Sequence, residues 1–149
     1  MRGRELRRRA RLLEAVTASL EQLRSEIAFR LTPMPEAAQR LAASGPEETR
    51  AFYALLSMKL TELGERGFRE LWDECVRALE LSREDEAVLS DLGGTLGRYS
   101  AEEQRAAFCR CIEKLGASAE EARAGAQSGS RLCTGLGLTL GMLLAIILF

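Results

Sequence analysis

Apolar residues recur at three- and four-residue steps along most of the chain, which is the spacing that gathers side chains on one face of an α-helix. The first series predicts one long amphipathic helix from about residue 4 to residue 31. Five further series predict shorter helices, and the third helix in the chain is expected over residues 47–63. No stretch alternates between apolar and polar positions for long enough to predict a strand. The residues predicted to face a common core are Leu13, Val16, Leu20, Leu23, Ile27, Ala37, Ala38, Leu41, Phe52, Leu55, Leu56, Leu60, Phe68, Leu71, Trp72, Cys75, Val76, Leu79, Val88, Leu89, Leu92, Leu96, Ala107, Phe108, Cys111, Ile112 and Leu115.

Residues that start or stop helices separate these segments. Gly45 with Pro46, and the two glycines of GERG, interrupt the pattern between helices. Ser and Thr are favoured at N-caps because the hydroxyl accepts a backbone N–H, and an acidic residue three positions later completes a capping box. The predicted caps are Thr32 with Pro33 at the first helical position, Ser82 with Asp85, and Ser100 with Glu103. The sequence therefore predicts an all-α bundle of about six helices over residues 1–126.

The end of the chain has a different composition. Residues 127–131 form a short polar linker, and no residue from Leu132 to Phe149 carries a charge. This run of 18 residues makes a helix of about 27 Å, close to the roughly 30 Å hydrocarbon core of a bilayer. We expect a C-terminal transmembrane helix over residues 132–149, with a buried core helix or an interfacial hairpin as the alternative.

Charges around this segment predict its orientation. Arg131, Arg123 and Lys114 precede the apolar run, and no basic residue follows it. The positive-inside rule then predicts that the bundle lies in the cytoplasm. Gly137 and Gly141 form a GxxxG step, which lets two membrane helices approach closely, although such a stripe of small residues also arises in helices without a partner.

Arginines crowd the start of the chain, yet the formal net charge of the whole molecule is -1. The molecule as a whole is therefore not expected to bind nucleic acid. Arg4, Arg7, Arg8 and Arg11 are candidates for contact with anionic lipid headgroups, with an ordinary solvated helix start as the alternative. No secretory signal opens the chain, so its four cysteines are expected to be free thiols in a reducing cytoplasm.

Neither a catalytic site nor a cofactor site is predicted. The chain contains no histidine, which removes the commonest general base and metal ligand. Cys109 and Cys111 are two residues apart and so point to different sides of a helix, and the adjacent Glu102 and Glu103 are splayed in the same way. GGTLG lacks a following Lys-Ser/Thr, and GLGLTLG follows no strand, so phosphate and dinucleotide sites are not indicated. We expect no enzyme, no metal and no cofactor.

The junction between the fifth and sixth helices, LGGTLGRYSAEEQ, carries the candidates for contact with a partner protein. These are Arg98, Tyr99 and Glu103, with a plain helix-capping role as the alternative. Its glycines are expected to permit a helix end and close packing.

Four stretches follow one another along the chain: SEIAFRLTPMPEAAQRLA (residues 25–42), Trp72, EDEAVLSDLGGTLGRYSAEEQ (residues 84–104) and the apolar end GLGLTLGMLLAIILF. In this order they resemble the stage III sporulation protein AB family, and the resemblance covers nearly the whole chain. The LGGTLGRYSAEEQ junction together with the apolar end is its most specific part.

The resemblance implies a bundle similar to the cytoplasmic domains of F-type platform proteins in type II secretion and type IV pilus machines. It implies a non-enzymatic membrane platform in the channel complex that endospore formers build between mother cell and forespore. The implied partners are a cytoplasmic ATPase of the stage III sporulation protein AA type, other stage III A channel proteins, membrane lipid and further copies of the chain. The implied location is the outer forespore membrane, with the bundle in the mother-cell cytoplasm.

The chain departs from the family pattern at two points. Members usually begin with a transmembrane helix ahead of the basic helix, whereas Met1 falls just before the arginines, so either the start lies upstream or this version has one anchor. Ser100 stands where the family often has Asp, and both residues cap helices. Two other functions fit the layout: a tail-anchored helical regulator unrelated to sporulation, and a platform of a general secretion or pilus system.

Overall fold

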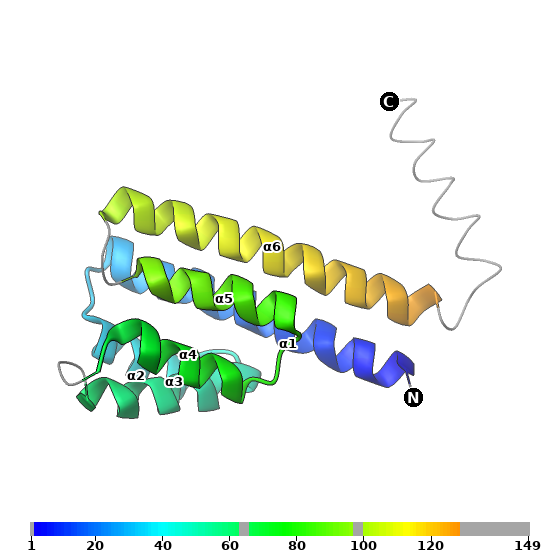
Figure 1. The fold of residues 1–149 in the computed structure, drawn as a ribbon, viewed down its shortest axis with the longest axis horizontal. Coiled ribbons are helices and arrows are strands. Elements are labelled where there is room, and N and C mark those ends of the chain that lie inside the picture. Colours follow the sequence, from blue (N-terminus) through cyan, green and yellow to red (C-terminus); the bar gives the residue numbers. More distant parts are fainter. Residues whose placement is uncertain (1, 63–65, 97–99, 129–149) are drawn as a thin grey trace.

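The computed structural model describes residues 2–62, 66–96 and 100–128. Two long helices lie side by side, three shorter helices pack against them, and a fourth, α4 (Phe68–Ala78), packs against α3 (Glu47–Lys59) and α5 (Arg83–Thr95) (Figure 1). The described residues contain no β-strand, so the predicted all-α class is confirmed for this part of the chain. The elements are α1 (Arg2–Arg24), a π-helix η1 (Ser25–Phe29), α2 (Met34–Ser44), α3 (Glu47–Lys59), a 3-10 turn η2 (Leu60–Glu62), α4 (Phe68–Ala78), α5 (Arg83–Thr95) and α6 (Ala101–Ser128).

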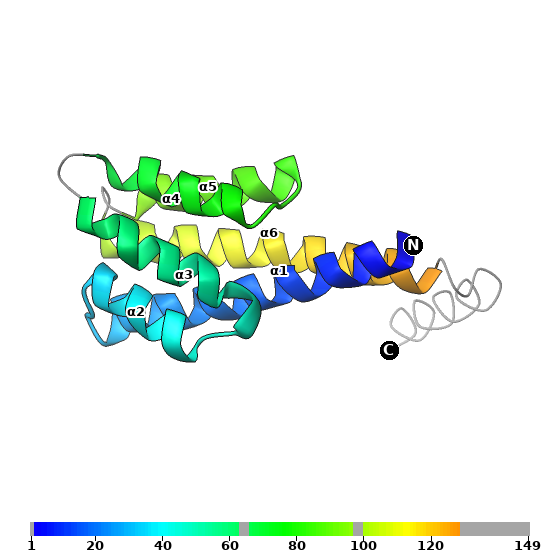
Figure 2. The ribbon, with the colours of Figure 1, turned by 90° about the horizontal axis from the view of Figure 1, so that it is seen from below.

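The long helices α1 and α6 are antiparallel and form the most extensive contact in the fold. The start of α1 and the end of α6 therefore lie at the same end of the molecule, where they extend beyond α2, α3, α4 and α5 (Figures 1 and 2). α6 lies on the opposite side of the bundle from α3 (Figure 1). Because of this pairing, residues near the start of α1 and residues near the end of α6 can contribute to the same surface.

The predicted core is the observed core. Leu13, Leu56, Trp72 and Leu115 have no exposed surface, and most of the other predicted inward residues are also buried. The exceptions are partly buried side chains that pack against this core: Ile27, Leu55, Phe68, Leu79, Val88 and Ile112. Helix periodicity located the core because each helix buries one continuous apolar stripe.

The segment between the first two helices differs from its prediction. α1 ends at Arg24, and the chain continues as the π-helix η1 up to Phe29. Thr32 does not cap α2, because its Oγ1 donates to the Glu26 carboxylate at 2.8 Å. The N-cap residue is Pro33, one position later than predicted, and no side chain caps this helix end. Because α2 starts one residue later than predicted, Thr32 lies outside the N-cap position, and both its backbone N–H and its hydroxyl donate to Glu26 instead.

The other two predicted caps are confirmed. Ser82 Oγ accepts the backbone N–H of Asp85 at 3.3 Å at the start of α5. Ser100 Oγ accepts the backbone N–H of Glu103 at 3.3 Å at the start of α6. The third predicted helix ends at Lys59 and continues as η2 rather than as α-helix to residue 63.

Among the residues that the structure describes, no helix combines the length and the apolar character needed to span a bilayer. The predicted transmembrane helix over residues 132–149 lies outside the described residues, and so does most of the predicted linker over residues 127–131. Both therefore stay predictions.

Candidate functional site

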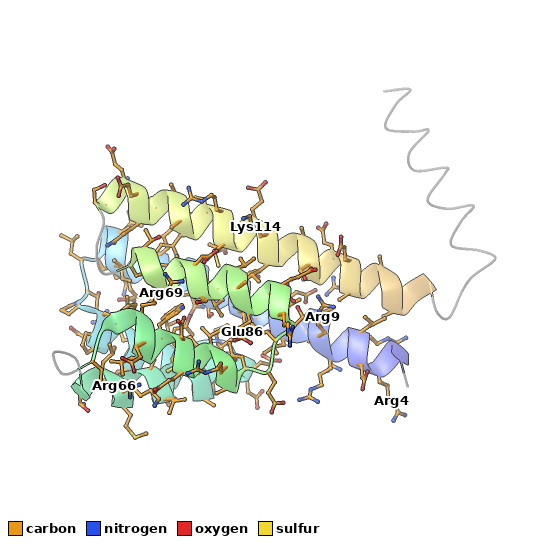
Figure 3. All side chains as sticks on the ribbon, viewed as in Figure 1. Arg4, Arg9, Arg66, Arg69, Glu86 and Lys114 are labelled. Atoms are coloured by element: carbon orange, nitrogen blue, oxygen red, sulfur yellow. The ribbon has the colours of Figure 1, made fainter. Side chains whose placement is uncertain are left out.

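Four exposed arginines form a stripe along the first half of α1. Arg4, Arg7, Arg8 and Arg11 are separated by three- and four-residue steps, so they share a face about 100° wide. All four are exposed, and none has an ion-pair partner among the described residues. Arg4 points away from α6 in Figure 3. We call these four residues the arginine stripe.

Arg9 lies on the same helix but has a structural role. Its Nη2 donates to Asp85 Oδ2 at 3.1 Å and to Ser118 Oγ at 3.1 Å. These bonds join α1 to both α5 and α6, with Asp85 itself buried (Figure 3). Arg9 therefore differs from the arginine stripe, because its guanidinium bonds to other helices whereas the four arginines of the stripe are exposed to solvent.

At the end of the molecule that carries the arginine stripe, α1 and α6 are in direct contact. Arg123 of α6 forms an ion pair with Glu14 of α1. Leu6 packs close to Gly125, since a Cβ at that glycine would lie 3.3 Å from Leu6 Cδ1. Because α6 ends at Ser128, the predicted apolar segment follows from the same end as the arginine stripe.

A groove of about 700 Å³ lies beside the stripe, between α1, α3 and α4. Arg8 and Arg11 line it from α1, and Glu48 of α3 and Glu80 after α4 line it as well. The other lining residues are apolar: Leu12, Ala51, Phe52, Leu55, Cys75, Ala78 and Leu79. The groove thus combines an apolar floor with two arginines that have no carboxylate partner in the described chain.

Of the predicted partner-contact residues, the structure describes only Glu103. Its side chain is exposed, and with Thr95, Ala106 and Arg110 it lines a shallow depression between α5 and α6. Arg98 and Tyr99 lie outside the described residues, and so do Gly137 and Gly141. Glu103 lies at the opposite end of α6 from Ser128, and therefore far from the arginine stripe (Figure 1).

Two exposed apolar residues near Glu103 were not found by sequence reasoning. Phe29 is 72% exposed and Leu31 is 80% exposed. Leu31 has a positive φ of 54°, which is uncommon for a residue other than glycine. The Arg105 guanidinium of α6 lies 5.8 Å from the centre of the Phe29 ring. The exposure of Phe29 could have been predicted from helical spacing, because Phe29 is two residues after Ile27 and so faces away from the core stripe.

Close packing at a glycine of the LGG stretch is confirmed for Gly93, whereas α5 continues past Gly93 and Gly94 to Thr95. A Cβ at Gly93 would lie 2.2 Å from Cδ1 of Trp72, so α5 can approach the indole only at a glycine. Trp72 is fully buried, and its Nε1 donates to Leu89 O at 2.8 Å. Phe52 packs edge-on against the same indole with ring centres 5.3 Å apart.

The titratable groups with shifted pKa values have structural explanations. Burial raises the pKa of the Cys75 thiol to about 11 and that of Cys111 to about 12. Hydrogen bonds from Arg66 and Lys59 lower the pKa of Glu74 to about 2. Within the described ranges, no group of three or more potential ligand residues could hold a metal ion. No constellation with the geometry of a catalytic site emerges from these residues.

A family model described as stage III sporulation protein AB matches residues 1–149. The chain belongs to the stage III sporulation protein AB family. It is similar to the stage III sporulation protein AB of Bacillus subtilis (strain 168), with 24% identity over 144 residues that cover 94% of this chain and 84% of the relative. No solved structure matches it significantly. The predicted family resemblance is confirmed, and membership of the stage III sporulation protein AB family supports a role in sporulation.

Proposed function

We propose that the chain is a non-enzymatic membrane platform of the channel complex between mother cell and forespore. In this proposal the six-helix bundle lies in the mother-cell cytoplasm, and residues 132–149 anchor it in the outer forespore membrane. The observation that carries the proposal beyond family membership is the antiparallel pairing of α1 and α6. This pairing brings the arginine stripe to the end of the bundle where α6 ends at Ser128, four residues before the uncharged segment begins in the sequence.

The pairing supports one consistent arrangement at the membrane. Exposed arginines at the membrane-proximal end suit the negative surface of a cytoplasmic leaflet. The opposite end of the bundle then faces the cytoplasm, where a soluble ATPase of the stage III sporulation protein AA type can reach it. Exposed apolar residues of the kind found at protein interfaces lie at this end, namely Phe29 and Leu31.

The anchor is tested by placing charges in the apolar segment. Leu144→Lys combined with Ile146→Lys should move the full chain from the membrane fraction to the soluble fraction, because two lysines in a span are costly to insert. A matched control replaces the same two residues with Ala, which keeps the segment apolar and should leave the chain in the membrane fraction. Retention of the lysine variant in membranes would contradict the single-anchor arrangement.

The platform role is tested in sporulating cells. Co-purification of the full chain should recover an ATPase of the stage III sporulation protein AA type and other channel proteins. Phe29→Gln with Leu31→Gln should weaken that recovery while the bundle stays folded, because both side chains are already exposed. Met58→Gln is a matched control, since Met58 is 65% exposed on α3. Recovery of no channel protein by the unmodified chain would contradict the platform proposal.

A further inference from the structure

The groove beside the arginine stripe has the two properties that a phospholipid requires of a protein surface. Its floor is apolar, with Leu12, Ala51 and Leu55 among the lining residues. Its α1 side carries Arg8 and Arg11, which are exposed and without a carboxylate partner in the described chain. We infer that this groove binds an anionic phospholipid of the bilayer, with the phosphate at the arginines and acyl carbons on the apolar floor.

Charge complementarity favours an anionic headgroup. The groove itself is lined by two arginines and two carboxylates, those of Glu48 and Glu80, and Arg4 and Arg7 of the arginine stripe add two positive charges on the same face of α1. Most arginines in the part of the chain that the structure describes are used by the fold, as Arg9 and Arg123 illustrate. The stripe differs from Arg9 and Arg123 because none of its four arginines forms an ion pair with a carboxylate of the described chain. A phosphate would supply the charge-assisted hydrogen bonds that a guanidinium favours.

The position of the groove favours a lipid over a soluble anion. It lies at the level of Ser118, which bonds to Arg9 between the two lining arginines, and α6 continues from there to Ser128, four residues before the uncharged segment that begins at Leu132. The inference rests on the proposed function in this respect, because the segment must enter a bilayer for the groove to meet its lipids. In this arrangement the side of the bundle formed by α1, α3 and α4 would tilt toward the bilayer near the membrane-proximal end, while Phe29 and Leu31 would stay at the end that faces the cytoplasm.

Lipid binding is measured by native mass spectrometry of the full chain in neutral detergent. The chain is titrated with phosphatidylglycerol and, separately, with phosphatidylcholine that has the same acyl chains. Arg8→Gln with Arg11→Gln should weaken phosphatidylglycerol binding by about 25-fold, since a basic residue near a lipid surface contributes about fivefold. Phosphatidylcholine binding should be the same for the variant and the unmodified chain. Arg110→Gln with Lys114→Gln is the matched charge control, because both residues are exposed on α6.

The apolar floor is tested on α3. Ala51→Gln places a larger polar side chain in the groove and should weaken phosphatidylglycerol binding. Ala54→Gln is the matched control, because Ala54 is exposed on the same helix and does not line the groove. Unchanged melting temperatures are expected for both variants, because neither alanine belongs to the core.

Four results would overturn the inference. The first is equal affinity for phosphatidylglycerol and phosphatidylcholine, and the second is an equal loss of phosphatidylglycerol binding in the α6 control. The third is displacement of phosphatidylglycerol by glycerol phosphate, which would make the groove a site for a free anion. The fourth is loss of a co-purifying acidic protein in the Arg8 and Arg11 variant with unchanged lipid binding, which would make the groove a protein-binding site. If the proposed function itself were wrong, a different result would show it: the full chain would be absent from cell membranes.

Discussion

Gly93 and Gly94 are adjacent in α5, yet the structure gives them opposite tolerance for a methyl group. A Cβ at Gly93 would lie 2.2 Å from Cδ1 of Trp72, inside the buried core. A Cβ at Gly94 would lie 2.9 Å from Nη1 of Arg69, the far end of a flexible and largely exposed side chain. Gly93→Ala should therefore destabilise the bundle, and Gly94→Ala should stabilise it.

The magnitude for Gly93→Ala follows from three contributions. Forcing an extra methyl group into a packed core costs about 1–3 kcal/mol. Movement of the indole also weakens the bond from Trp72 Nε1 to Leu89 O, and a buried unsatisfied N–H costs about 1–3 kcal/mol. Replacing glycine with alanine in a helix raises the free energy of unfolding by about 1 kcal/mol at most. The expected net loss is about 2–3 kcal/mol for Gly93→Ala, against a gain of about 0.4–1 kcal/mol for Gly94→Ala.

The assay is thermal unfolding of the full chain in neutral detergent, followed by circular dichroism and by the emission of the single tryptophan. For a chain of this size, the melting temperature should fall by about 5–10 °C for Gly93→Ala and rise by about 1–3 °C for Gly94→Ala. Trp72→Phe in the Gly93→Ala background should recover part of the loss, because the smaller ring frees the space that the methyl group needs. Equal effects of the two alanine substitutions would refute this account of the glycine pair.

Three further outcomes are expected. Trp72→Ala should lower the free energy of unfolding by about 3–5 kcal/mol, measured by denaturant titration, because the side chain is fully buried; an unchanged value would place the indole outside the core. Ion pairing lowers the pKa of Glu74 from 4.5 to about 2, so its contribution to stability is present above pH 4.5 and is lost as the pH falls toward 2. The difference in melting temperature between the unmodified chain and Glu74→Gln should accordingly shrink between about pH 6 and about pH 3, and a constant difference would contradict the ion-pair account. At about pH 8, alkylation followed by peptide mapping should modify the exposed Cys109 at least ~100-fold faster than the buried Cys75 and Cys111; comparable rates would contradict their burial.

The sequence determined the helical class, the residues of the core and two of the three predicted caps. These features are local or periodic: a helix must bury its apolar stripe, and a serine at a helix start meets backbone N–H groups only a few residues away. Trp72 was recognisable as an inward residue for this reason. The absence of histidine likewise limits the chemistry available to the chain, whatever its fold.

The candidate site was predictable only in part. The arginine stripe could be read from three- and four-residue spacing, because residues at that spacing share a helix face. The groove beside it could not, because much of the apolar floor comes from α3 and α4, more than 35 residues away along the chain. The exposure of Phe29 agrees with regular helical spacing from Ile27 and could have been predicted. Leu31 was missed because the π-helix and its own positive φ break the regular spacing on which the prediction depended.

Only the tertiary structure decided which parts of the chain lie together. The antiparallel packing of α1 against α6 places the arginine stripe at the end of the bundle where α6 ends at Ser128. Thr32 binds Glu26 rather than a helix end, and Gly93 lies against Trp72, for the same reason. Helix formation depends on neighbours within one or two turns, whereas the choice of packing partner depends on how all the apolar faces are buried at once.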